Sequence, residues 1–174
     1  MYRQYHSWVR NWNRKVTILQ LRQLTYSRVA QFYYRFSKCS FSRCTSLKTI
    51  TLPESLTNIC DFDHSGIEKI TIPSGVTEIR RFTFEACNSL KSVVIKGPVA
   101  QIDDNAFRDC TALNTIELPV GIKKIGKEAF KGCTSLKTIN VPAKKADYYK
   151  KRLPENLHSL IVELPAEKAA SKRK

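Results

Sequence analysis

Aliphatic residues recur along this chain in groups of three, and the spacing within the group is the same each time. They occupy positions 1, 4 and 6 of each group, and successive groups begin 20, 23, 23 and 23 residues apart. Positions 4 and 6 share one side of a β-strand, because strand side chains alternate with a period of two, and position 1 anchors the bend before the strand. The groups are Leu47/Ile50/Leu52, Ile67/Ile70/Ile72, Leu90/Val93/Ile95, Leu113/Ile116/Leu118 and Leu136/Ile139/Val141. The pattern predicts five short strands, one in each repeat.

Two more aliphatic residues, three apart, follow the strands. They are Leu56/Ile59, Val76/Ile79, Val99/Ile102 and Ile122/Ile125. A single strand cannot bury its apolar face, but coils stacked in parallel at about 4.8 Å bring the same repeat position into one interior column. The sequence therefore predicts a solenoid with a parallel sheet on one wall and a second aliphatic wall opposite.

Phenylalanine, cysteine and leucine share the 23-residue period, and proline follows several of the strand groups. These repeat positions are Phe84, Cys87, Leu90, Phe107, Cys110, Leu113, Phe130, Cys133 and Leu136, with Pro142 after Val141. The combined pattern resembles the BspA-like leucine-rich repeats of bacterial and protist proteins, many of them on cell surfaces. The resemblance implies a leucine-rich repeat fold, mainly β or of α/β type, and a non-catalytic protein-binding scaffold related to cell-surface adhesion.

One copy departs from this pattern. Ile59 is eight residues from Ile67, whereas Ile79 is eleven from Leu90. Three residues are missing, so we expect Phe62 to fill its position differently from the other phenylalanines.

The sequence divides into four segments. We expect residues 41–142 to form a solenoid of about five coils, residues 143–165 a C-terminal cap of a helix plus a strand, and residues 166–174 a disordered basic tail. In the cap, Leu157, Leu160 and Val162 repeat the strand spacing, which turns Ile161 outward. Residues 1–40 carry aromatic residues at helical spacing among basic ones. They fit a helical cap, a degenerate repeat, or a basic amphipathic helix.

The formal net charge of +15 comes from the two ends of the chain. Residues 54–142 contain 11 basic and 11 acidic residues, whereas residues 1–53 contain 10 basic and no acidic residue. An alternative function is therefore an intracellular protein whose basic termini bind nucleic acid or anionic membrane. Taken literally, the absence of a signal peptide or transmembrane segment predicts a cytoplasmic protein, whereas the family resemblance implies the cell surface.

Little in the sequence indicates catalysis, a metal or a cofactor. Four cysteines lie three residues before the anchoring aliphatic, which predicts a packing column, and no pair has the close spacing of a structural zinc site. His6, His64 and His158 lie in the basic N-terminus, a shortened turn and the cap, and Asp103 and Asp104 fit a turn. We therefore expect no cofactor and no catalytic residue.

The candidate site is the outward face of the strands, which we expect to bind a protein. Its residues are Thr49, Thr51, Lys69, Thr71, Ser92, Val94, Thr115, Glu117, Thr138 and Asn140.

Overall fold

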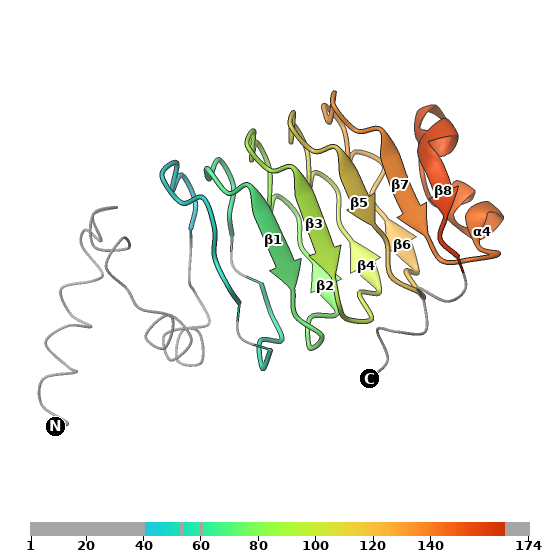
Figure 1. The fold of residues 1–174 in the computed structure, drawn as a ribbon, viewed down its shortest axis with the longest axis horizontal. Coiled ribbons are helices and arrows are strands. Elements are labelled where there is room, and N and C mark those ends of the chain that lie inside the picture. The colour runs from blue at the N-terminus through green and yellow to red at the C-terminus, as the bar shows by residue number, and fades with distance from the viewer. Residues whose placement is uncertain (1–40, 53, 60, 166–174) are drawn as a thin grey trace, which may run out of the picture.

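The computed structural model describes residues 41–52, 54–59 and 61–165, which stack as successive coils of a solenoid (Figure 1). The first parallel sheet has the order β1 (Lys69–Ile72), β3 (Ser92–Ile95), β5 (Thr115–Glu117), β7 (Thr138–Val141) and β8 (Ile161–Glu163). The second has the order β2 (Glu78–Ile79), β4 (Gln101–Ile102) and β6 (Lys124–Ile125). The predicted solenoid of stacked parallel strands is confirmed. In the first described coil, an isolated parallel bridge between Thr49 and Lys69 continues the first sheet.

The strand register explains the 23-residue period. Ile70 pairs with Val93, Val93 pairs with Ile116, and Ile116 pairs with Ile139. Each step is therefore one complete coil. Burial alternates along β1, β3 and β7, with position 4 and 6 aliphatics inside.

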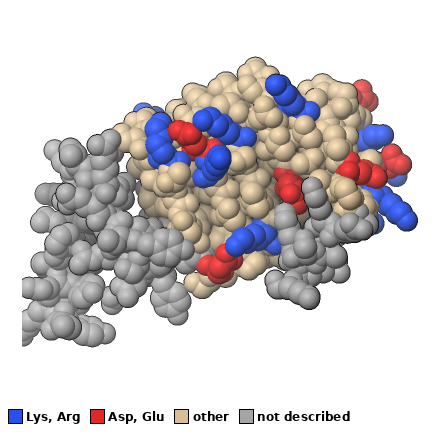
Figure 2. Space-filling model, viewed as in Figure 1, with Lys and Arg blue, Asp and Glu red and all other residues tan. Residues whose placement is uncertain are grey.

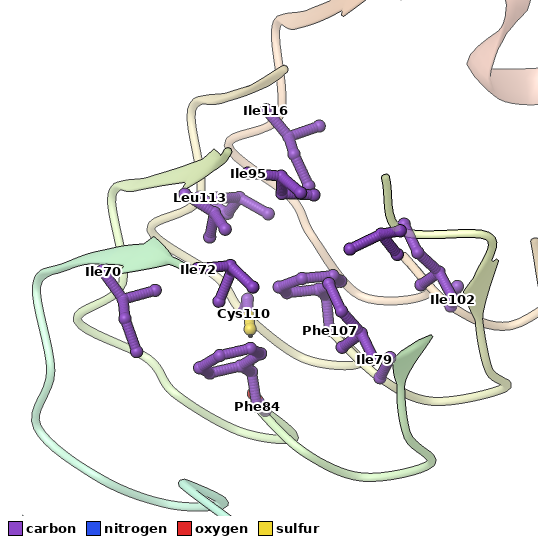
Figure 3. Close-up of a cluster of buried hydrophobic side chains, with 14 of the residues drawn as sticks. Ile70, Ile72, Ile79, Phe84, Ile95, Ile102, Phe107, Cys110, Leu113 and Ile116 are labelled. Atoms are coloured by element: carbon purple, nitrogen blue, oxygen red, sulfur yellow. Dashed lines mark hydrogen bonds between the residues drawn. The ribbon is translucent and has the colours of Figure 1, made fainter. Parts of the chain in front are cut away.

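The interior lies between the two sheets. Figure 3 shows Ile70 and Ile72 on one wall, Ile79 and Ile102 on the other, and phenylalanine rings between them. The second-wall aliphatics are all buried: Leu56, Ile59, Val76, Ile79, Val99, Ile102, Ile122 and Ile125. The second wall predicted from the sequence is thus an apolar wall, and part of it is hydrogen-bonded as a sheet.

The phenylalanines form one stack through the core. Ring centroids are 5.2 Å apart between Phe84 and Phe107, and 5.4 Å between Phe107 and Phe130. The expectation for Phe62 is wrong, because its fully buried ring stands in the same stack, 5.0 Å from Phe41 and 5.5 Å from Phe84. The shortened copy lacks two residues before Phe62 and one after it, so the turns absorb the deletion.

A third set of backbone hydrogen bonds joins the coils beside the phenylalanine stack. The residue two positions after Phe84 is Ala86, whose amide donates to the Arg108 carbonyl at 2.8 Å. In each described coil from Phe41 to Phe130 this position has a positive φ. The residues are Arg43, His64, Ala86, Asp109 and Gly132. Since glycine is the residue that adopts this conformation without strain, four of the five turns have a non-glycine residue at a position that favours glycine.

The C-terminal segment contains helix α4 (Ala146–Lys150), the 3-10 helix η1 (Glu155–Leu160) and β8. The Ala100 carbonyl accepts the Lys123 amide of the next coil, at 2.7 Å. The equivalent carbonyl of Lys123 accepts a hydrogen bond from the Nε of Arg152, at 3.3 Å. A side chain thus supplies the donor that a further coil would have supplied, so this carbonyl at the end of the second wall is hydrogen-bonded.

The register of β8 differs from the expectation by one residue. Ile161 pairs with the inward-facing Ile139 and is packed against the core, whereas Val162 pairs with Asn140 and is 48% exposed. The predicted inward position of Val162 and outward position of Ile161 are therefore wrong. The coil is one residue short, because η1 runs directly into β8. The expectations for residues 1–40 and 166–174 lie outside the described residues.

Candidate functional site

The outward face of the first sheet aligns polar residues in straight columns. Lys69 lies opposite Ser92, and Ser92 and Thr138 both lie opposite Thr115. The bridge to Thr49 extends this column into the first described coil. In the second column, Thr71 lies opposite Val94, and Glu117 lies opposite Asn140. The structure thus aligns the first column, from Thr49 to Thr138, and two pairs of the second column, whereas no strand pairing places Thr51.

This face is open and mostly polar. Thr49, Thr51, Lys69 and Thr71 are exposed, and no described helix lies over β1, β3 and β5 in Figure 1. Val94 is the large hydrophobic residue of these columns and is 38% exposed. The remaining members are half-buried: Ser92, Thr115, Glu117, Thr138 and Asn140. Such a face offers hydroxyl and amide groups around one apolar position.

Opposite charges lie next to one another around the stack, as Figure 2 shows for one face. The Nζ of Lys91 is 2.9 Å from the Oε2 of Glu68 in the preceding coil, and the hydrogen bond from Lys91 lowers the pKa of Glu68. The Nζ of Lys96 also contacts the Oε1 of Glu54, at 2.5 Å, across two coils. Exposed pairs add little stability, so their effect is to leave a surface of mixed sign.

The cysteine column forms hydrogen bonds between coils. The Sγ of Cys87 donates to the Phe62 carbonyl at 3.0 Å, and the Sγ of Cys133 donates to the Phe107 carbonyl at 3.1 Å. Burial raises the pKa of Cys133 to about 12 and raises that of Cys110 further above its usual range. Since the nucleophile is the thiolate, these protonated thiols are suited to packing and hydrogen bonding.

The four described cysteines, Cys44, Cys87, Cys110 and Cys133, are free thiols. No group of three or more histidine, cysteine or acidic side chains that could hold a metal occurs in the described part of the chain. In the shortened coil Ser65 occupies the cysteine position, with its Oγ 3.4 Å from the Sγ of Cys87. The column therefore accepts a hydroxyl where a thiol normally stands.

The structure groups Ser42, Asp63 and His64 at a turn of the shortened coil. The Oγ of Ser42 donates to the Oδ2 of Asp63 at 2.8 Å, and the Nδ1 of His64 is 3.4 Å from the same oxygen. A nucleophilic serine needs a base against its hydroxyl, but here the carboxylate lies between the serine and the histidine. The contacts instead join the first two described coils.

A shallow hollow lies at the turns beside the second sheet, lined by residues of three coils. The sequence predicts only a turn at Asp104 and singles out none of the other lining residues. Arg81, Asp104 and Lys127 share one position of the 23-residue period, and Asn105 and Glu128 share the next, but the residue types differ from coil to coil, so no residue motif marks the hollow. The main polar residues are Arg81, Asp104, Asn105, Lys124, Lys127 and Glu128.

Comparison with known proteins gives one family match. The family model described as BspA type leucine-rich repeat region (6 copies) matches residues 20–137 and residues 61–161. No curated protein matches significantly. A crystal structure of a leucine-rich repeat protein from Bacteroides ovatus is similar at 20% identity with a TM-score of 0.32, over 71% of this chain and 49% of that chain. The chain thus spans about half the length of that protein.

Among the described residues, no helix has the length and apolar character needed to cross a membrane.

Proposed function

Because the chain belongs to the BspA type leucine-rich repeat family, a family of repeat scaffolds, we propose that it is a non-catalytic scaffold that binds a protein partner. The proposed surface is the outward face of β1, β3, β5 and β7. The observation that carries the proposal is the straight column in which Lys69, Ser92, Thr115 and Thr138 stand in register. Such a column presents side chains at fixed separations along one rigid surface.

The rigidity of this surface has a structural basis. The core behind it contains fully buried aliphatic side chains and the phenylalanine stack, and the parallel ladder fixes the backbone. A surface that is ordered before binding loses less conformational entropy when a partner binds. Val94 lies opposite Thr71, so an apolar contact at this position would be surrounded by hydrogen-bonding groups.

The test compares a face variant with a matched control. A protein captured by the full chain is purified, and its affinity is measured by biolayer interferometry for the wild type, Val94→Arg and Thr77→Arg. Thr77 is exposed and precedes the second sheet. We expect Val94→Arg to abolish binding and Thr77→Arg to retain it, with both variants showing the wild-type circular dichroism spectrum. Equal affinity for the two variants would exclude this face.

A cell-surface role in adhesion is the second part of the proposal, and it is supported by family membership. Protease treatment of intact producing cells tests it. We expect the full chain to be digested without cell lysis, together with loss of adhesion to the captured partner. Protection of the chain in intact cells would contradict surface exposure.

A second candidate function is supported by the charge distribution. Ten basic and no acidic residues occur in residues 1–53, which favours binding of an anionic membrane or a nucleic acid. Binding to DNA or to anionic vesicles would then weaken steeply with salt and would require the basic N-terminal residues. Salt-insensitive binding, or equal binding after removal of residues 1–35, would exclude it.

A further inference from the structure

The hollow beside the second sheet has a volume of about 490 Å³ and is open to solvent on one side. Arg81 follows β2, Asp104 and Asn105 follow β4, and Lys127 follows β6. The three turns come from consecutive coils. A binding site here is therefore assembled by stacking and not by any one repeat.

Asn105 lies in this hollow with an unsatisfied hydrogen-bonding capacity. The residue is 5% exposed, and its Oδ1 has no hydrogen-bond partner in the described structure. A buried polar side-chain atom without a partner is uncommon in native proteins. Because the last torsion of asparagine is soft, a small rotation can present the amide to a molecule in the hollow.

The hollow carries more unpaired positive than negative charge. No described carboxylate lies within 4.0 Å of the charged nitrogens of Arg81, Lys124 or Lys127. Of the two acids that line the hollow, Glu128 is already bound by Lys131, at 2.9 Å. This charge balance favours a ligand with one negative charge, because the two acids would repel a doubly charged group.

Phe82 does not itself line the hollow, but it directly follows the lining residue Arg81 and has an exposed aromatic side chain. Its backbone φ is +64°, and the ring is 39% exposed. The guanidinium carbon of Arg81 is 4.8 Å from the ring centroid. A bulky residue in the left-handed region is an outlier, and such strain is concentrated at functional sites. Asn105, at the same repeat position of the next coil, also has a positive φ.

We propose that this hollow binds a sugar unit that carries a carboxylate. The cations Arg81, Lys124 and Lys127 bind the carboxylate, while the Asn105 amide and the Asp104 carboxylate hydrogen-bond to hydroxyl groups. The Phe82 ring, which contacts Arg81 outside the lining residues, packs against the apolar C–H face of the sugar where the sugar extends beyond the hollow. This combination requires an anion, a hydroxyl array and an apolar face in one small molecule, which an acidic sugar provides. The site is separate from the outward face of the first sheet and goes beyond protein binding.

The binding test uses the full chain, labelled with ¹⁵N and titrated with sodium glucuronate, glucose and inorganic phosphate. We expect glucuronate to shift the amide signals of Asp104, Asn105 and Gly126 in a saturable manner. Glucose should bind at least about tenfold more weakly, because it lacks the charge-assisted contacts. Equal binding of glucose, equal binding of phosphate, or no saturable shift at these amides would overturn the proposal.

Two variants assign the site, and one serves as a control. Asn105→Gly removes the amide and tolerates the positive φ, and Lys124→Gln removes a lining charge. Each should weaken glucuronate binding by about fivefold or more. Lys123→Gln makes the same charge change at the preceding exposed residue, which does not line the hollow, and should change affinity less than twofold. If both lining variants bind as the wild type does, or if the control loses as much affinity, the assignment fails.

Discussion

The thiol of Cys110 donates a hydrogen bond to the Phe84 carbonyl of the preceding coil, across 3.0 Å. The same oxygen accepts the amide of Cys87 at 3.2 Å. A carbonyl oxygen has two lone pairs, so both are used. The spacing of phenylalanine and cysteine that recurs in the repeats therefore serves hydrogen bonding as well as packing.

This bond leads to a prediction about thiol reactivity. Burial raises the pKa of Cys110, so almost no thiolate is present at pH 8, and alkylation should require unfolding. The half-buried Cys44 should react earlier. Site-resolved mass spectrometry after iodoacetamide treatment, with and without urea, measures both rates. Native-state labelling of Cys110 as fast as that of Cys44 would contradict a buried, protonated column.

The phenylalanine stack predicts a large loss of stability when one ring is removed. Phe107 is fully buried between Phe84 and Phe130, and Phe107→Ala should lower the free energy of unfolding by about 3–5 kcal/mol. Phe82→Ala removes the same side chain at an exposed position and should cost less than about 1 kcal/mol. Urea unfolding followed by circular dichroism compares them. Similar losses for the two variants would show that the stack is not a principal source of stability.

The positive-φ turns predict a stabilising substitution. Ala86 has a φ of +53°, so Ala86→Gly should relieve strain and, after the larger entropy of the unfolded glycine is subtracted, raise stability by about 0.5 kcal/mol. The reverse change, Gly132→Ala, should destabilise, because φ is +78° and the added Cβ would lie 2.0 Å from the Oδ1 of Asp109. Unfolding midpoints measure both. Destabilisation by Ala86→Gly would contradict the strained turn.

The C-terminal segment should loosen in acid because of Glu163. Hydrogen bonds from the backbone amides of Ala146, at 2.7 Å, and Lys144, at 3.1 Å, lower the pKa of this carboxylate. A lowered folded-state pKa means that the stabilisation is present above the unfolded value, near 4.5, and is lost as pH falls through the folded value. Hydrogen exchange of residues 144–163 should therefore accelerate between pH 6 and pH 3, after correction for intrinsic rates.

Glu163→Gln provides the control for this pH effect. The variant should exchange faster than the wild type at pH 6 and show little further loosening in acid. Glu155→Gln changes an exposed acid of η1 and should keep the wild-type pH dependence. A wild-type pH response in Glu163→Gln would assign the effect to another group.

The position of Phe62 shows where sequence reasoning reached its limit. Counting residues revealed that its copy is three short, but it could not show which part of the coil yields. Stacking on Phe41 and Phe84 is a contact between coils, and burial of the ring outweighs the regular length of the turns. The one-residue shift of Ile161 has the same origin, since η1 determines how much chain is left to enter β8.

The sequence by itself determined the coil, the two walls and the outward columns. Those features repeat every 23 residues, and an alternating strand with a buried face has one possible orientation, as Ile70, Val93 and Ile116 show. Only the tertiary structure decided how the stack ends and where its turns meet. The Nε of Arg152 on the Lys123 carbonyl, and the hollow between Arg81, Asn105 and Lys127, depend on groups from different coils. The period aligns Arg81, Asp104 and Lys127, but it does not show that their turns enclose a hollow or that the Arg152 side chain reaches the Lys123 carbonyl, because both depend on packing in three dimensions.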